Sequence, residues 1–84
     1  MPLSPREFDL LMFFARHSGD VVTRMQLLEA VWNLHFDPQT NVVDVHVSRL
    51  RRKLETVMKR PVLHTERGEG YVFAPARAPV PNPV

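Results

Sequence analysis

The sequence predicts a small, mainly α-helical (α+β) domain in which three helices are followed by a C-terminal β-hairpin. Three observations support this fold class. Two capping-box sequences lie in the first third of the chain, a helical apolar stripe runs through residues 41–54, and two β-rich runs, 62–65 and 71–74, flank a glycine-containing loop. The length of 84 residues allows one domain, and a hydrophobic share of 44% is enough for one modest core.

Residues 5–17 are predicted to form the first helix. Ser4 is a suitable N-cap, Pro5 occupies the first helical position, and Glu7 completes a capping box. Gly19 follows closely and is a plausible stop. The apolar face of this helix is expected to consist of four residues at helical spacing, namely Phe8, Leu11, Met12 and Ala15.

Residues 24–33 are predicted to form the second helix, after a short extended piece at 21–22. Thr23 can act as its N-cap, and Gln26 repeats the capping box. Its apolar face is expected to contain Leu27, Leu28, Val31 and Trp32.

A third helix is predicted over residues 41–54. The preceding stretch contains the turn signal Asp37-Pro38, and Thr40 or Asn41 can cap the helix. Pro61 requires the helix to stop a few residues before it. Its buried stripe is expected to be Val43, Val47, Leu50 and Leu54.

The C-terminal part is predicted to contain a hairpin and a tail. The runs VLHT and YVFA flank ERGEG, so residues 62–74 read as a β-hairpin. Residues 75–84 contain four prolines and are expected to form a flexible or polyproline-like extension of the folded domain 1–74. Three helices followed by a hairpin constitute a winged helix-turn-helix domain, with the hairpin as the wing.

Several function classes are disfavoured by the sequence. Cysteine is absent, which excludes disulfides and thiolate metal sites and fits a reducing, cytoplasmic compartment. No apolar run is long enough to span a bilayer, and the N-terminus lacks the features of a secretory signal. No catalytic motif or phosphate-binding glycine loop is found. We therefore expect no membrane association, no cofactor and no enzymatic activity.

A metal site is also disfavoured. Asp44 and His46 are two residues apart on a helix, so their side chains diverge, whereas helical metal pairs prefer a spacing of four. We expect His46 at the edge of the core, and Asp44 in a cap or an ion pair.

The charges are distributed unevenly. Residues 1–39 hold three basic and five acidic residues, a net charge of −2, whereas residues 40–84 hold eight basic and four acidic residues, a net charge of +4. Such an asymmetry suggests a polyanion-binding face on one side of the fold. Six of the eleven basic residues lie within 40–60: Arg49, Arg51, Arg52, Lys53, Lys59 and Arg60.

The outward face of the third helix has the residue types that read DNA bases. Arginine can donate two hydrogen bonds to guanine, asparagine can pair with adenine, and valine can contact the thymine methyl group. Arg51 and Lys53 point more to the sides, where phosphates would lie, and Arg67 lies in the turn of the wing. The predicted base contacts are Asn41, Val45, Ser48, Arg49 and Arg52.

Several sequence blocks resemble one known family. TNVVDVHVSRLRRKL followed by TERGEGYVF is similar to the C-terminal effector domain of OmpR/PhoB-type response regulators, and SPREFDLL, DVVTRMQLLEAVW and FDPQTNVVDVHV resemble the same family in the same order. The resemblance covers residues 3–74. It implies a bacterial two-component transcription factor, controlled by a phosphorelay, that binds double-stranded promoter DNA, usually as two copies in tandem on direct repeats.

The resemblance also implies roles for individual residues. Asn41, Val45, Ser48 and Arg49 would face bases, and Arg51, Thr65 and Arg67 would meet phosphate or the minor groove. Trp32 would lie near the DNA backbone. Gly68, Gly70 and Tyr71 would form the wing's turn and its anchoring aromatic. The connector between the second and third helices would touch RNA polymerase, with Leu34, His35, Phe36, Asp37 and Pro38 as the contacting residues.

The chain also departs from the family pattern. Ser48 stands where the family often has a cation, and Glu66 and Glu69 add two negative charges to the wing. The family domain begins with a small antiparallel sheet that is expected to be missing here, so the first helix would lose one packing partner. A receiver domain with its phosphoaccepting aspartate would lie outside this chain.

Two alternatives to DNA binding remain open. The winged fold could dock a protein partner through the third helix or the connector, with only weak non-specific DNA affinity. RNA binding is disfavoured because few aromatic residues are left for base stacking.

Overall fold

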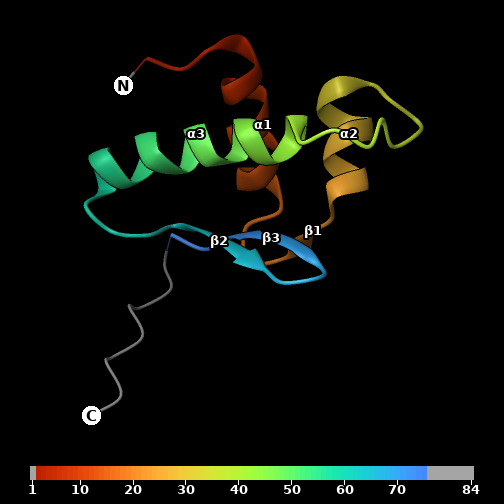
Figure 1. Ribbon diagram of the computed structural model, residues 1–84. Helices are drawn as coiled ribbons and strands as arrows, with labels where there is room; N and C mark the ends of the chain where they lie inside the picture. The colour runs from red at the N-terminus through yellow and green to blue at the C-terminus, as the bar shows by residue number, and fades with distance from the viewer. Residues whose placement is uncertain (1, 76–84) are drawn as a thin grey trace.

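The computed structural model describes residues 2–75, so nearly all of the predicted tail, 76–84, lies outside the described residues. The elements are α1 (Pro5–Arg16), β1 (Val21–Val22), α2 (Arg24–Trp32), α3 (Val42–Met58), β2 (Leu63–Glu66) and β3 (Gly70–Phe73). Figure 1 shows α3 crossing in front of α1, with the small sheet beneath the helices. The predicted plan of three helices and a C-terminal hairpin is confirmed.

The sheet has three antiparallel strands rather than the two of the predicted hairpin. The strand order is β1-β3-β2, so the last strand of the domain occupies the centre. Residues 21–22 are extended, as predicted, and they also pair with β3: Val21 lies opposite Val72 and Val22 opposite Tyr71. A two-residue strand is too short to show an alternation of apolar and polar residues, and its partner lies about fifty residues away in the sequence. The pairing could therefore not be predicted from the sequence.

Close backbone packing joins β1 to β3 at one glycine. Gly70 has a φ of +151°, and a Cβ atom on it would lie 2.1 Å from the Val22 carbonyl oxygen. Only glycine leaves room for this approach. The junction between the two strands therefore depends on the missing side chain of Gly70.

Both predicted capping boxes are confirmed. At the start of α1 the Ser4 hydroxyl accepts from the Glu7 N–H at 3.2 Å, and the Glu7 carboxylate accepts from the Ser4 N–H at 2.9 Å. At the start of α2 the Thr23 hydroxyl accepts from the Gln26 N–H at 3.1 Å, and the Gln26 side chain accepts in return at 2.7 Å. These reciprocal bonds satisfy amide groups that a helix start leaves unpaired.

The predicted apolar face of α1 is wrong except at Leu11, which is half-buried against the core. The helix buries Glu7, Leu10 and Phe14, whereas Phe8 is 53% exposed and Met12 is 39% exposed. The segment FDLLMFFA has apolar residues nearly all round the helix, so periodicity alone does not select the inner face. The face of α1 that is buried is determined by its packing against α2, α3 and β3.

The buried stripe of α3 is confirmed, since Val43, Val47, Leu50 and Leu54 are all buried. The helix begins after Asn41, but the Asn41 side chain makes no capping hydrogen bond, contrary to expectation. It continues past the predicted recognition segment 41–54 to Met58 and so ends a few residues before Pro61, as predicted. In the part of the chain that the structure describes, no helix is both long and apolar enough to cross a membrane.

The core lies between the three helices and the sheet. Its fully buried members come from every helix and from β1, β2 and the residue before β2. The largest of them are Phe14, Leu10, Leu27, Leu28, Leu50 and Leu63. This packing fixes α3 against α1 on one side and the hairpin on the other.

Candidate nucleic-acid interface

The outer face of α3 brings together four of the five predicted base-contacting residues. Val45, Ser48, Arg49 and Arg52, together with Asp44, line a shallow hollow of about 290 Å³. Val45 is half-buried and the other three predicted residues are exposed. Asn41, also exposed, lies at the N-cap of the helix and does not line the hollow.

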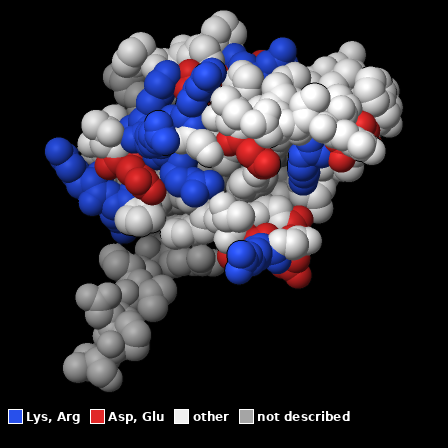
Figure 2. All heavy atoms as spheres, viewed as in Figure 1, with Lys and Arg blue, Asp and Glu red and all other residues white. Residues whose placement is uncertain are grey.

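The arginines of this face are available to a ligand. Within residues 2–75, neither the Arg49 nor the Arg52 side chain has an ion-pair or hydrogen-bond partner. Figure 2 shows Lys and Arg side chains gathered over the region where α3 runs in Figure 1, with further basic atoms over the hairpin below. An exposed face with unpaired guanidinium groups attracts polyanions.

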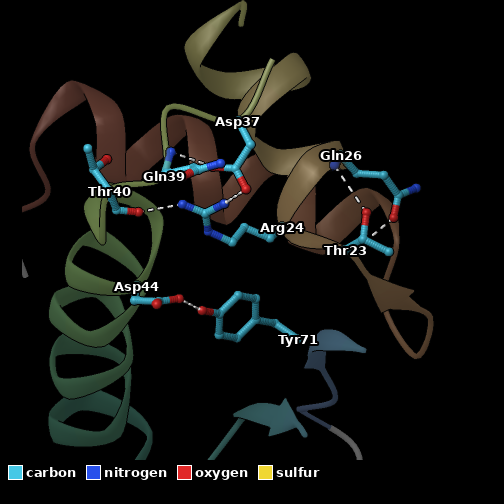
Figure 3. Close-up of polar contacts among 8 residues, drawn as sticks. All are labelled: Thr23, Arg24, Gln26, Asp37, Gln39, Thr40, Asp44 and Tyr71. Carbon is cyan, nitrogen blue, oxygen red and sulfur yellow. Dashed lines mark hydrogen bonds and ion pairs between the residues drawn. The ribbon is translucent and has the colours of Figure 1, made fainter. Parts of the chain in front are cut away.

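Asp44 is a member of this face that the sequence analysis missed. Its carboxylate accepts a hydrogen bond from the Tyr71 hydroxyl, rather than forming the expected cap or ion pair (Figure 3). Burial and the hydrogen bond to Asp44 raise the pKa of Tyr71, so the hydroxyl stays protonated and donates. The helical spacing of Asp44, Ser48 and Arg52 was the signal that could have placed Asp44 here.

A second contact links α3 to the wing. An Arg51 guanidinium nitrogen, Nη2, donates to the Thr65 hydroxyl over 3.0 Å. The structure therefore places these two predicted backbone-contacting residues side by side. Arg67, a third predicted member, is exposed in the turn between β2 and β3.

Lys53 lies on the opposite side of α3 and is already paired. Its ammonium group is 2.7 Å from the carboxylate of Glu7, which is only 4% exposed. Burial alone would raise the pKa of Glu7, but hydrogen bonds from Lys53 and Ser4 outweigh it and lower the pKa to about 2. Lys53 is therefore partly neutralised, unlike Arg49 and Arg52.

Trp32 ends α2 in a half-buried position beside α3. His46 lies edge-on to the Trp32 ring, with ring centroids 5.3 Å apart, and its Nδ1 is 2.8 Å from the Val42 carbonyl oxygen. His46 is thus at the edge of the core, as predicted. The guanidinium group of Arg6 also lies over the Trp32 ring, 5.0 Å from the ring centroid.

The connector between α2 and α3 is held by one arginine. Arg24 donates to the Asp37 carboxylate at 2.5 Å and to the Thr40 carbonyl, and Asp37 also accepts from the Gln39 N–H at 2.7 Å (Figure 3). The hydrogen bond from Arg24 and then that from Gln39 lower the pKa of Asp37, so its carboxylate stays ionised.

The predicted polymerase-contacting residues differ in exposure within this connector. Phe36 is 62% exposed and His35 and Asp37 are also exposed, whereas Leu34 and Pro38 are half-buried. Leu34 packs against the core, and its N–H donates to the Leu28 carbonyl. Within residues 2–75, no three His, Asp or Glu side chains are grouped so that they could hold a metal ion.

Comparisons with known proteins agree with this architecture. The family model described as "Transcriptional regulatory protein, C terminal" matches residues 1–73. The chain is 50% identical over 72 residues to the alkaline phosphatase synthesis transcriptional regulatory protein PhoP of Bacillus subtilis, covering 84% of this chain and 30% of PhoP. It is 53% identical over 71 residues to the transcriptional regulatory protein PrrA of Mycobacterium leprae, with coverages of 84% and 30%.

A solved structure is similar as well. The Klebsiella pneumoniae RstA DNA-binding domain in complex with the RstA box superposes with a TM-score of 0.77 at 39% identity, covering 88% of this chain and 74% of that one. The chain spans about a third of the length of the curated relatives it matches. It belongs to the family of C-terminal domains of transcriptional regulatory proteins, the winged-helix DNA-binding domains of OmpR/PhoB-type response regulators.

Proposed function

We propose that this domain binds promoter DNA in a sequence-specific manner as part of a transcriptional regulator. In this proposal α3 lies in the major groove, and the wing, residues 62–74, lies on the adjacent backbone or minor groove. The observation that carries the proposal is the outer face of α3, where unpaired Arg49 and Arg52 surround the half-buried Val45. A B-DNA major groove admits one α-helix, and these residue types read base edges.

Each residue of the face has a chemical role in this proposal. Arg49 and Arg52 donate to guanine, Asn41 pairs with adenine, and Val45 contacts a thymine methyl group. The Ser48 hydroxyl can form a hydrogen bond with either a donor or an acceptor group on a base edge. Asp44 also lines the hollow, and its carboxylate can accept from the cytosine amino group and would repel a phosphate.

The backbone contacts fall on both sides of α3. Arg51, Thr65 and Arg67 are proposed to meet phosphate or the minor groove on the wing side. Trp32 and Lys53 are proposed to do so on the α1 side. Phosphate contacts fix the register of the helix in the groove, and the base contacts then decide the sequence.

The roles of the whole protein are also proposals, because the chain spans about a third of its curated relatives. We propose that two copies bind in tandem on direct repeats and that a receiver domain elsewhere in the protein couples binding to a phosphorelay. The exposed Phe36 and His35 of the connector offer a contact for RNA polymerase. The domain itself is proposed to be non-catalytic and to act in the cytoplasm, where a bacterial chromosome lies.

One observation favours the alternative of a protein-interaction module. Phe36 is 62% exposed on the connector, and Phe8 is 53% exposed on α1. Large exposed apolar side chains often mark protein-binding surfaces. Salt separates the two functions, because binding through several phosphates weakens steeply as salt rises.

The test is selection of the chain on a random duplex library, read at two salt concentrations. We expect one enriched motif, present as a direct repeat, with affinity that falls steeply as salt rises. A selection that yields no motif at either salt concentration, together with binding that does not depend on salt, would overturn DNA recognition and leave the protein-interaction module.

A further inference from the structure

The side chains of α3 fall into three parallel stripes. Asp44 and Arg51, seven residues apart, contact Tyr71 and Thr65 of the hairpin. Val45, Ser48 and Arg52 line the outer hollow, and Asp44 borders it on the wing side. His46, Arg49 and Lys53 face the start of α1 and line a second recess. The base-reading stripe is therefore flanked by the wing on one side and by α1 on the other.

The recess on the α1 side is an open cleft of about 630 Å³. Its lining comes from the first turns of α1 and from α3: Ser4, Pro5, Arg6, Glu7, Asp9, His46, Arg49 and Lys53. Arg49 lines both this cleft and the outer hollow, so the two surfaces are continuous. A group bound in the cleft would lie directly beside the base-reading face.

Arg6 is fixed at the edge of this cleft. Its guanidinium group donates to the Val31 carbonyl, one of the carbonyls that the C-terminal end of α2 leaves without a helical partner. The same group stacks over Trp32. A guanidinium group has five N–H donors, so most of its donors remain for a ligand. The Arg6 side chain is therefore held in one position while most of its N–H groups remain free to donate to a ligand.

The charge balance of the cleft depends on Arg6. Glu7 is buried and paired with Lys53, so these two groups largely cancel. Among residues 2–75, the guanidinium groups of Arg6 and Arg49 have no carboxylate partner. Asp9 is the remaining anion in the lining. Without Arg6, Asp9 would offset Arg49, and the cleft would lose its excess positive charge.

We propose that this cleft binds a backbone phosphate of the DNA strand that borders the major groove opposite the wing, with Arg6 as the phosphate-binding residue. The inference rests on the proposed function. A helix in the major groove lies between two phosphate backbones, and the wing is proposed to contact one of them. The planar guanidinium group of Arg6 can donate two parallel hydrogen bonds to phosphate oxygens of the second backbone.

The first test measures the affinity of the 84-residue chain for its best selected duplex across a range of salt concentrations. We expect Arg6→Gln to reduce the slope of log K against log salt by about 0.9, the value for one phosphate contact. Arg16→Gln is the matched control, because it removes the same charge from the far end of α1, and its slope should equal that of the wild type. An Arg6→Gln slope equal to the wild-type slope would overturn the proposal.

A second variant guards against loss of folding in Arg6→Gln, which also removes the contact with Val31. Asp9 is exposed, so Asp9→Asn removes an anion of the cleft without changing a buried side chain, and we expect it to tighten binding to every duplex. Unchanged affinity for Asp9→Asn would count against phosphate binding in the cleft. Thermal melts of all variants show which of them are folded.

A third measurement locates the phosphate. Single phosphates of the selected duplex are replaced by neutral methylphosphonates, and one replacement opposite the wing should weaken wild-type binding but not further weaken Arg6→Gln. Equal losses for both proteins at every position would overturn the inference while leaving the proposed function intact. Wild-type binding without any salt dependence or sequence preference would instead defeat the proposed function itself.

Discussion

The Tyr71 hydroxyl donates a hydrogen bond to the Asp44 carboxylate, and this bond joins the central strand of the sheet to α3 (Figure 3). The contact between Arg51 and Thr65 lies seven residues further along the same helix and makes a second connection. The helix proposed to read bases and the wing proposed to contact the backbone are therefore held in one relative orientation before any ligand binds.

Tyr71→Phe tests the first of these connections. Hydrogen bonds to charged groups contribute roughly 1.5–3 kcal/mol, so we expect a loss of stability in this range in urea unfolding. Thr65→Val removes the more exposed connection and is expected to cost less. If the two variants unfolded at the same urea concentration as the wild type, neither contact would stabilise the fold.

Gly70→Ala and Gly68→Ala form a matched pair in the wing. Gly68 has a φ of +78° with open space around it, so alanine there carries backbone strain alone, roughly 1–2 kcal/mol. At Gly70 the new methyl group would lie 2.1 Å from the Val22 carbonyl oxygen. We expect Gly70→Ala to be clearly the less stable in thermal melts, and the reverse order would contradict the close packing of β1 on β3.

The low pKa of Glu7 leads us to expect that the stability of the fold decreases in acid. Its pKa of about 2 lies below the ordinary value of 4.5, so its contribution is complete above pH 4.5 and is lost as the pH falls towards 2. The difference corresponds to roughly 3 kcal/mol at most. We expect the melting temperature to fall through this range of pH.

Glu7→Gln supplies the control for the acid response. It keeps a capping residue at the third helical position but removes the negative charge that pairs with Lys53. We therefore expect a lower melting temperature near neutral pH and a smaller decrease of the melting temperature below pH 4.5. Asp9→Asn, an exposed site on the same helix, should retain the acid response. An acid response of Glu7→Gln as steep as that of the wild type would exclude Glu7 as its source.

Arg49→Ala tests base recognition by α3. A bidentate contact with guanine contributes roughly 1–3 kcal/mol of discrimination, so we expect that loss at one base pair of the selected duplex. Duplexes carrying each alternative base at every position, titrated with both proteins, provide the measurement. Equal weakening on selected and random duplexes would reassign Arg49 to a phosphate contact.

Arg67→Ala tests the wing. We expect weaker binding on all sequences and a slope of log K against log salt reduced by about 0.9, as for one lost phosphate. Fluorescence anisotropy at several salt concentrations measures both quantities. An unchanged slope would remove the turn of the wing from the interface.

The sequence predicted those features that local chemistry decides. The capping boxes at Ser4 and Thr23 are confirmed because each is complete within four residues. The stripe of α3 is confirmed because its apolar residues alternate clearly with charged ones. The outer face of the same helix could be predicted as the complement of that stripe.

The features that were missed depend on distant partners. The partner of β1 lies at Tyr71 and Val72, and nothing in residues 21–22 indicates it. The inner face of α1 is chosen by packing, since Phe8 and Leu10 are both apolar and only Leu10 is buried. The pairing of Lys53 with Glu7 joins residues 46 positions apart.

The place of β3 in the sheet has a consequence for biosynthesis. It is the last strand of the domain, yet it lies between the other two and pairs with both. During synthesis on a ribosome, β1 and β2 therefore have no strand to pair with until residues 70–73 have emerged. The three helices are made earlier and cannot pack against a complete sheet before then. Loss of these four residues by premature termination would leave two strands that have no partner.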